Sequence, residues 1–243
     1  MPEGVHRLLR PAWVVSHLTV LALLVATVNL GLWQIRRLED RRDHNHQVEI
    51  QTRQELSPVV TAVHDVEFTD DLRYRPVTAT GTFDPERDVQ LANRSRDGAP
   101  GIELVTPLVL TGRFGEAVAV NRGFVPLAVL AEADPSSWAP PAGVIEAIGL
   151  AMISQPGGQA SGEQINRIDL DLLAERWDLS LLPVYMQVSS AESESWPLPL
   201  PTPNLGEGSH LSYAVQWFIF TLIGMVGYPL VLVRLARQNG LVA

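Results

Sequence analysis

The sequence predicts a membrane protein of the α+β class. Two transmembrane helices, near the N- and C-termini, would flank a mainly antiparallel β domain with one or two short helices. Uncharged apolar runs at residues 11–35 and 211–233 carry this prediction. A helix of about 20 apolar residues crosses the hydrocarbon core of a bilayer, so each run is long enough to span it. Charged residues form only 19% of the 243 residues, below the usual quarter of a soluble domain.

Charge and proline content change at the ends of the apolar runs, and these changes set the expected boundaries. Alternating opposite charges after the first run predict a solvated helix that extends it. The expected segments are a cytoplasmic N-terminus (1–11), a first span (12–34), a charged helical extension (35–57), a β-rich domain (58–195), a proline-rich strap (196–209), a second span (210–233) and a cytoplasmic C-terminus (234–243).

The first apolar run predicts a retained membrane anchor. Trp13 and Trp33 lie near its ends, where amphipathic rings prefer the level of the lipid headgroups. A cleaved signal peptide is the competing interpretation, with Arg7 and Arg10 as its basic region. The run is long for a signal peptide and no small-residue cleavage site precedes Arg36, so the anchor is favoured.

Small and polar residues inside the spans predict contact between helices. Gly224 and Gly227 leave one side of the second span without bulky side chains and would permit close packing. The alternative, that they are ordinary glycines of a transmembrane helix, fits the sequence equally well. His17 and Asn29 lie within the first span and are expected to face a partner helix instead of lipid.

The charges predict the topology of the chain. Arg7 and Arg10 before the first span, with Arg234 and Arg237 after the second, favour the cytoplasm for both termini. The connection between the spans carries 14 arginines against 26 acidic residues, which gives no basic patch for nucleic acid. We therefore expect a multi-pass protein of a bacterial plasma membrane, in contact with membrane lipid, whose main domain is extracytoplasmic.

The composition excludes several chemistries. Because the sequence has no cysteine, disulfides and thiolate metal sites are impossible. All 18 basic residues are arginine, so Schiff-base lysines and Walker-A loops are excluded as well. The sequence contains no GxSxG, HExxH or GxGxxG motif. We therefore predict no catalytic residue and no metal site.

Short β-type runs bounded by turn residues follow Pro58. The segment 111–115 (TGRFG) is typical of a hairpin loop between two of them. Asp169 is expected to be the N-cap of a short helix that ends at Trp177. Four prolines between Trp196 and Gly208 predict a stiff, extended strap. The strands are expected at residues 74–83, 89–93, 102–110, 117–125, 144–152 and 184–188.

His210 stands out among the histidines because it directly precedes the second span. Ionisable groups at membrane boundaries are functional candidates, and neutral imidazole is a common axial ligand of haem iron. The alternative is an interfacial histidine that simply begins a helix, with Ser209 as its cap.

Four sequence blocks resemble motifs of the Surfeit locus protein 1 family. Within that family, the chain resembles an actinobacterial-type member. Residues 31–37 (GLWQIRR) resemble its GxWQxxR signature, and residues 74–77 (YRPV) with 81–84 (GTFD) resemble its early domain block. Residues 120–126 (VNRGFVP) are similar to VNRGWVP, and residues 210–218 (HLSYAVQWF) to HLxYAxxWF. The blocks occur in the family's order. Phe124 replaces the usual tryptophan, and the aromatic–lysine pair that often follows the first block is replaced by residues 38–41 (LEDR).

The resemblance implies an assembly factor for haem-a cytochrome c oxidase, acting on the catalytic subunit without enzymatic turnover. Some bacterial members of the family bind haem a, and the histidine at the second span is the candidate ligand, which here is His210. Tyr213 and Trp217 follow three and seven positions later, so one helix face would present all three to a haem. The alternative is that both aromatic residues are membrane-interface anchors.

The motif residues are also candidates for contact with the oxidase. Arg122 would suit a haem propionate or an acidic partner surface, unless it is paired within the domain. Gly123 would supply a positive φ or a bulge at the end of a strand. The full set of expected partner contacts is Trp33, Gln34, Arg37, Asn121, Arg122, Gly123, Gly224 and Gly227.

Two other functions remain as alternatives. A structural accessory subunit would stay in the mature oxidase or a respiratory supercomplex through its two helices. An extracytoplasmic enzyme is disfavoured by the lack of catalytic motifs.

Overall fold

The computed structural model describes residues 10–188 and 195–238, and it separates into two compact units. The helical unit comprises Met1–His46 and Leu205–Ala243, and the β domain comprises Gln47–Asn204. The predicted fold class is confirmed, because two apolar helices near the chain ends flank a segment that is mostly strands.

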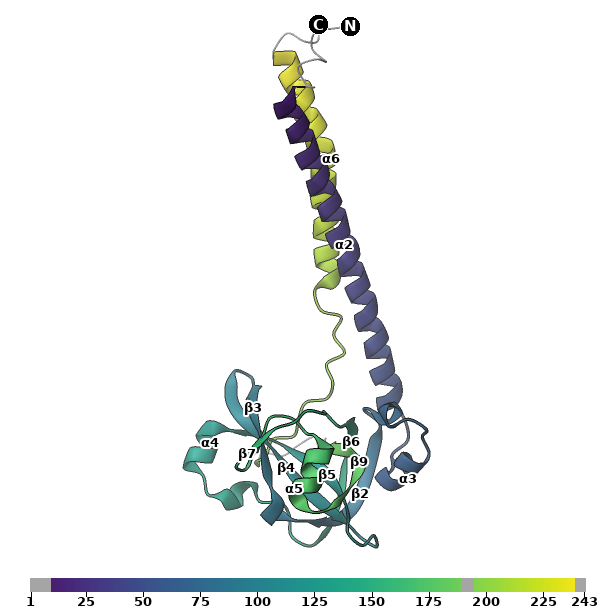
Figure 1. The fold of residues 1–243 in the computed structure, drawn as a ribbon, viewed down its shortest axis with the longest axis vertical. Helices are drawn as coiled ribbons and strands as arrows, with labels where there is room; N and C mark the ends of the chain where they lie inside the picture. The colour runs from purple at the N-terminus through teal and green to yellow at the C-terminus, as the bar shows by residue number, and fades with distance from the viewer. Residues whose placement is uncertain (1–9, 189–194, 239–243) are drawn as a thin grey trace. The chain divides into compact units, whose positions relative to one another are not determined.

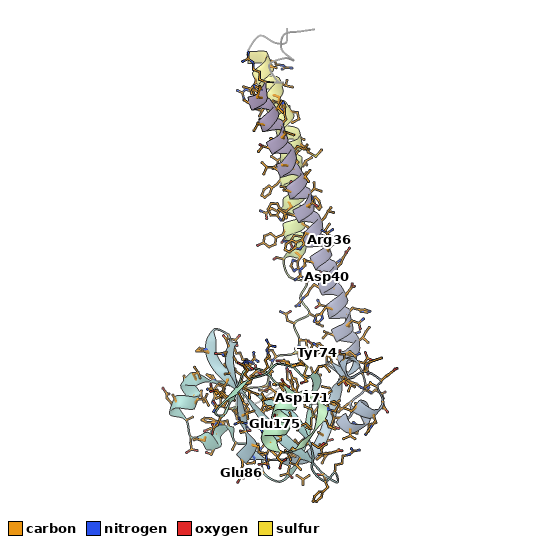
Figure 2. All side chains as sticks on the ribbon, viewed as in Figure 1. Arg36, Asp40, Tyr74, Glu86, Asp171 and Glu175 are labelled. Atoms are coloured by element: carbon orange, nitrogen blue, oxygen red, sulfur yellow. The ribbon has the colours of Figure 1, made fainter. Side chains whose placement is uncertain are left out.

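The helical unit consists of α2 (Pro11–Thr52) and α6 (His210–Gln238), which run antiparallel beside each other (Figure 1). Both helices are long and apolar enough to cross a membrane. At a rise of 1.5 Å per residue, α2 is about 60 Å long, twice the roughly 30 Å thickness of a hydrocarbon core. Arg36 and Asp40, labelled in Figure 2, lie where its charged half begins. That half must therefore extend beyond the membrane core.

A seam of buried and half-buried residues runs along each helix at alternating spacings of three and four. This is the heptad pattern of a coiled coil, which keeps one face of each helix against its partner. Near the middle of the seam, the Thr221 hydroxyl donates a hydrogen bond to the Thr27 hydroxyl at 2.8 Å. The seam comprises His17, Val20, Leu24, Thr27, Gly31, Gln34 and Leu38 on α2, and His210, Ala214, Trp217, Thr221, Gly224 and Tyr228 on α6.

His17 faces α6, as the sequence predicts. Its Nδ1 lies 2.7 Å from the hydroxyl of Tyr228, which is also 3.1 Å from the hydroxyl of Ser16. The same prediction is wrong for Asn29, whose side chain is exposed. Asn29 lies outside the heptad seam, so its amide donates instead to the Val25 carbonyl of its own helix at 2.7 Å.

In the described part of the β domain, five strands close into a ring. Strand β2 pairs with both β6 and β4, which completes the order β2–β6–β9–β5–β4. The ring pairs are antiparallel except for β5 and β9, which are parallel. The strands are β1 (Ser57–Pro58), β2 (Pro76–Phe83), β3 (Val89–Arg96), β4 (Ala99–Leu110), β5 (Glu116–Pro126), β6 (Val144–Ile153), β7 (Ala160–Ser161), β8 (Gln164–Ile165) and β9 (Ser180–Val188).

The strands expected from the sequence are present as β2, β3, β4, β5, β6 and β9, and residues 111–115 connect β4 to β5 as a hairpin. The predicted cap is also confirmed. The Asp169 carboxylate accepts hydrogen bonds from the backbone of Asp171 and Leu172 at the start of α5 (Leu170–Trp177). The structure adds the short helices α3 (Val59–His64) and α4 (Leu127–Glu132), and the 3₁₀ turns η1 (Thr69–Leu72), η2 (Pro85–Arg87) and η3 (Pro135–Trp138).

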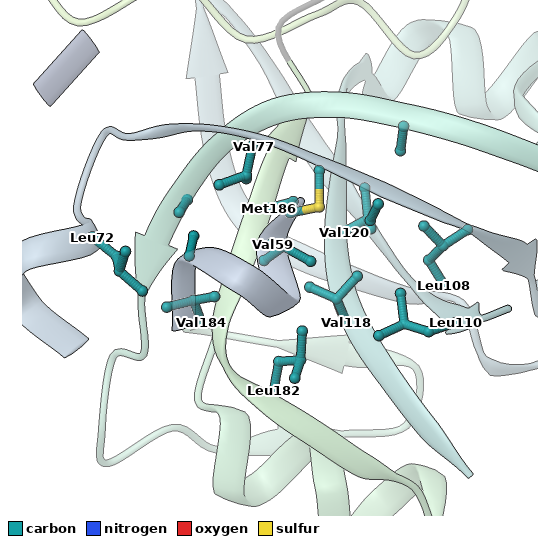
Figure 3. Packing of buried hydrophobic residues seen from close by; sticks show 14 of the residues in the cluster. Val59, Leu72, Val77, Leu108, Leu110, Val118, Val120, Leu182, Val184 and Met186 are labelled. Carbon is teal, nitrogen blue, oxygen red and sulfur yellow. The ribbon is translucent and has the colours of Figure 1, made fainter. Parts of the chain in front are cut away.

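The main hydrophobic cluster takes side chains from every strand of the ring and from α3 (Figure 3). Successive residues of a strand point to opposite faces, so Leu182, Val184 and Met186 of β9 enter this cluster. Tyr185 points the other way, into a second cluster that α5 covers with Leu173 and Trp177. Full burial of one such aliphatic side chain stabilises the fold by about 1.5–3 kcal/mol.

Tyr185 should make the β domain less stable in alkali. Burial, followed by the negative charge of Glu103, raises the pKa of Tyr185 to about 12, whereas an unfolded tyrosine titrates near pH 10. Between these values the unfolded chain releases the phenolic proton first, so stability falls as pH rises. We expect the free energy of unfolding to drop by about 1 kcal/mol between pH 10 and 11 because of this residue. Denaturant titrations of the wild type and Tyr185→Phe should show a shallower decline in the variant, and equal slopes would contradict the assignment.

Candidate functional site

His210 and Gln34 meet at one end of the helical unit. His210 is the first residue of α6, and its Nδ1 lies 2.9 Å from Oε1 of Gln34 on α2. Both residues belong to the heptad seam and are half-buried. The contact joins the first sequence block, GLWQIRR, to the last, HLSYAVQWF.

This hydrogen bond selects one tautomer of the imidazole. An amide oxygen only accepts hydrogen bonds, so the Nδ1 that faces Gln34 carries the proton. In the neutral ring the Nε2 nitrogen then keeps its lone pair, and it makes no hydrogen bond to the residues that the structure describes. A neutral imidazole oriented through its other ring nitrogen is the arrangement that metal-ligating histidines adopt.

The segment before His210 is fixed to α2 by hydrogen bonds. Arg42 forms a bidentate pair with Glu207, with N–O distances of 2.8 and 3.0 Å. Asn45 donates to the Leu205 carbonyl at 2.7 Å. The Arg42 guanidinium also lowers the pKa of the exposed Glu207 carboxyl. These contacts hold the chain in place directly before the histidine, which restricts the positions that its ring can adopt.

Tyr213 and Trp217 lie on the same side of α6 as His210, as their spacing predicts. Tyr213 is 49% exposed, whereas Trp217 is half-buried in the seam. The Trp217 ring meets the ring of Phe220 edge-on, with centroids 5.8 Å apart. The three predicted residues therefore form an aromatic side next to the histidine, with the tyrosine accessible to a ligand.

Trp33 and Arg37 point away from the seam. Trp33 is 48% exposed, and Arg37 is exposed beside Asp40, with an N–O distance of 3.7 Å. Both side chains are thus available for contact with another protein or with lipid headgroups. Gln34, from the same block, instead makes its hydrogen bond within the helical unit, to His210.

Asn121 and Arg122 are buried, and they contact different neighbours within the β domain. The Asn121 amide donates to the Glu103 carboxylate at 2.6 Å. The Arg122 guanidinium donates to the Thr106 hydroxyl at 2.6 Å and to the Trp138 carbonyl at 2.7 Å. These contacts agree with the alternative in which Arg122 is paired within the domain.

Arg122 also forms an ion pair with Asp88, at 2.7 Å between Nη2 and Oδ2. Burial raises the pKa of Asp88 and lowers the pKa of Arg122, while their mutual attraction opposes both shifts. A register shift in the β4–β5 ladder, a β-bulge, leaves Arg122 without a partner residue on β4. The bulge lets the arginine lie among its acceptors instead of continuing the ladder.

Gly123 is required where the strap meets β5. The backbone N–H groups of Phe124 and Leu198 each donate to the other's carbonyl at 2.8 Å. Gly123 adopts a φ of +130°, and a Cβ there would lie 2.2 Å from the Leu198 carbonyl oxygen. The prediction of a positive φ at Gly123 is confirmed. The close approach of the strap is a second reason why this position needs glycine.

The glycines of the second span differ in their surroundings. A Cβ on Gly224 would lie 2.8 Å from the Leu24 side chain, so this glycine allows close packing against α2. A Cβ on Gly227 would meet no atom within 4 Å. The expected close packing is therefore present at Gly224, while Gly227 borders open space.

Several site residues were not singled out by sequence reasoning. Asp88 and Thr106 hold Arg122, and Glu103 holds Asn121, but each resembles an ordinary strand or turn residue in the sequence. Within residues 10–188 and 195–238, no three His, Asp or Glu side chains cluster closely enough to hold a metal ion.

The fold and the site define a class of protein: a membrane protein with two spans, a β domain encoded between them, and a histidine oriented at the start of the second span. The SURF1 family model matches residues 21–222. The chain therefore belongs to the SURF1 family, which is known for cytochrome c oxidase assembly factors.

The relatives have the same family name. An uncharacterized SURF1-like protein of Mycobacterium tuberculosis is 27% identical over 90% of this chain and 83% of its own length. The Surfeit locus protein 1 of Xenopus tropicalis is 25% identical over 82% of this chain and 70% of its own. The human Surfeit locus protein 1 is 30% identical over 44% of this chain and 39% of its own.

Proposed function

We propose that this protein is an assembly factor for haem-a cytochrome c oxidase. It assists insertion of haem a into the catalytic subunit, or stabilises that subunit, without enzymatic turnover. Membership of the SURF1 family supports the oxidase as its target. The observation that carries the haem-handling part is the hydrogen bond between Gln34 and His210.

The residues around His210 suit a haem. Nε2 of His210 offers a lone pair, and haem iron accepts an imidazole nitrogen as an axial ligand. Tyr213 and Trp217 supply aromatic surface on the same side of α6. Because the site lies at the first turn of an apolar helix, an amphipathic ring could enter it from the bilayer. His210 holds the ligand, and Gln34 fixes the orientation of His210.

The proposed location is a bacterial plasma membrane, with both termini in the cytoplasm and the β domain outside it. Arg10 before the first span and Arg234 and Arg237 after the second support this orientation. The long acidic connection between the spans does not oppose it, since long domains cross the membrane largely regardless of charge.

The test is a haem spectrum of the purified protein. The full chain, His210→Ala and the matched control His64→Ala would be produced in a host that makes haem a and purified in detergent. We expect a reduced haem a spectrum in the wild type and in His64→Ala, and its loss in His210→Ala.

The outcomes separate the proposed functions. A wild type without haem a, or a His210→Ala variant that keeps all of it, would contradict haem handling by this histidine. Stoichiometric retention of the protein in purified mature oxidase would favour the accessory-subunit function, because an assembly factor leaves its product.

A further inference from the structure

The helical unit has an apolar groove of about 490 Å³ between α2 and α6. This volume falls within the roughly 300–1,000 Å³ typical of small-molecule sites. On α6 the groove extends from Phe220 to Val231, and the lack of a side chain at Gly227 opens it. Its α2 wall consists of Val20, Leu23, Leu24 and Thr27.

The groove lies on the same flank of α6 as Tyr213, one of the three candidate haem residues. Tyr213, Phe220 and Gly227 are seven residues apart, so they occupy equivalent positions on one side of the heptad seam. Trp217 connects the two regions, because its ring contacts Phe220 at the end of the groove. A ligand beside His210 would therefore be in line with the groove.

The opposite flank of the seam is filled nearer to His210, at the level of Gly31. There the Phe218 ring covers Gly31 of α2, and a Cβ on Gly31 would lie 2.8 Å from the ring carbons. The Phe218 ring thus fills the space beside Gly31 on that flank.

The groove begins at a defined distance from His210. Phe220 begins ten residues after His210, which corresponds to about 15 Å along the helix axis. Tyr228 lines the far part, where its hydroxyl is held by His17 and Ser16. A ligand anchored at His210 would need a long, flexible and wholly apolar extension to occupy this space.

We propose that the groove holds the isoprenoid tail of haem a. Haem a carries a farnesyl chain that haem b lacks, and this chain would extend from the His210 site past Trp217 and Phe220 toward Gly227. The inference rests on the proposed function, since it assigns a place to one part of that ligand. It implies that the protein distinguishes haem a from haem b by the tail.

The test compares the two haems on a variant with a filled groove. Apo protein, purified as the full chain in detergent, would be titrated with haem a and with haem b and followed by absorbance. Gly227→Leu should weaken haem a binding about tenfold, which corresponds to about 1.4 kcal/mol, and leave haem b binding within twofold of the wild type. Ala22→Leu also ends in leucine, at an exposed position of α2 away from the groove, and should change neither affinity.

Failure of this inference can be told apart from failure of the proposed function. If His210→Ala loses both haems while Gly227→Leu binds haem a like the wild type, the tail lies elsewhere and the proposed function stands. If Gly227→Leu weakens both haems equally, the groove does not recognise the tail. If the wild type binds neither haem, both proposals fail. Loss of oxidase subunits from Gly227→Leu purifications, with haem a binding intact, would assign the groove to a partner helix and overturn the inference.

Discussion

Replacement of Arg122 by methionine is expected to lower the free energy of unfolding of the β domain by about 3 kcal/mol or more. The variant would leave Asp88 as a largely buried carboxylate without its counter-ion, and loss of one partner from a buried pair typically costs about 3–5 kcal/mol. The Trp138 carbonyl and the Thr106 hydroxyl would also lose a donor. Denaturant unfolding of the full chain in detergent, followed by tryptophan fluorescence, measures the effect.

A matched control separates this pair from arginine pairs in general. Arg113→Met removes a partly exposed pair with Glu116, which should cost less than about 1 kcal/mol. The combined change of Arg122→Met with Asp88→Asn should recover part of the loss, since no buried charge remains. Equal stabilities of Arg122→Met and Arg113→Met would show that the Asp88 pair does not stabilise the domain.

The loss in free energy of unfolding caused by Arg122→Met should also depend on pH. Without the guanidinium, only the hydrogen bond from Thr106 opposes the burial that raises the pKa of Asp88, so the folded variant binds its proton more tightly than the unfolded chain does. Protonation removes the unpaired charge. The difference from the wild type should therefore be smallest in acid and grow as pH rises through the pKa of Asp88.

The sequence predicted much of the helical unit because bilayer thickness constrains it directly. An uncharged run either reaches the length of the hydrocarbon core or does not, and both runs here do. The contact between Gln34 and His210 was not predictable in the same way. The two residues lie 176 positions apart, and neither periodicity nor charge fixes the register of an antiparallel helix pair. Each residue was a candidate by itself, and only the fold brings them together.

In the β domain the strands were predictable and their arrangement was not. Alternation and turn residues locate β2 and β4, but nothing local states that they pair and close the ring. The buried Arg122 depends on that arrangement, and also on a bulge that the sequence predicted only as one of two alternatives at Gly123. Asp88, its partner, resembles a turn residue after Pro85. The function of the VNRGFVP block as a packing motif could therefore be recognised only from the tertiary structure.

Replacement of Gln34 by methionine should weaken haem a binding about 10- to 100-fold while leaving His210 in place. Methionine has a similar size but offers no amide oxygen, so the imidazole would lose the hydrogen bond that fixes its tautomer and orientation. Loss of such a partner of a ligating histidine typically costs this factor in affinity. Gln34→Glu keeps an acceptor oxygen and should retain most of the binding. Gln216→Met makes the same replacement at an exposed position of α6 and should have no effect.

Two readouts separate orientation of the histidine from a general role in helix packing. If Gln34 acts through the imidazole, ferric haem in Gln34→Met should show an altered ligand field in its electron paramagnetic resonance spectrum, while thermal unfolding stays close to the wild type. If Gln34 serves only to hold α2 against α6, Gln34→Met should unfold at lower temperature and bind haem with an unchanged spectrum. Wild-type affinity in Gln34→Met would mean that the hydrogen bond does not orient the ligand, and the case for His210 would then depend on its own substitution alone.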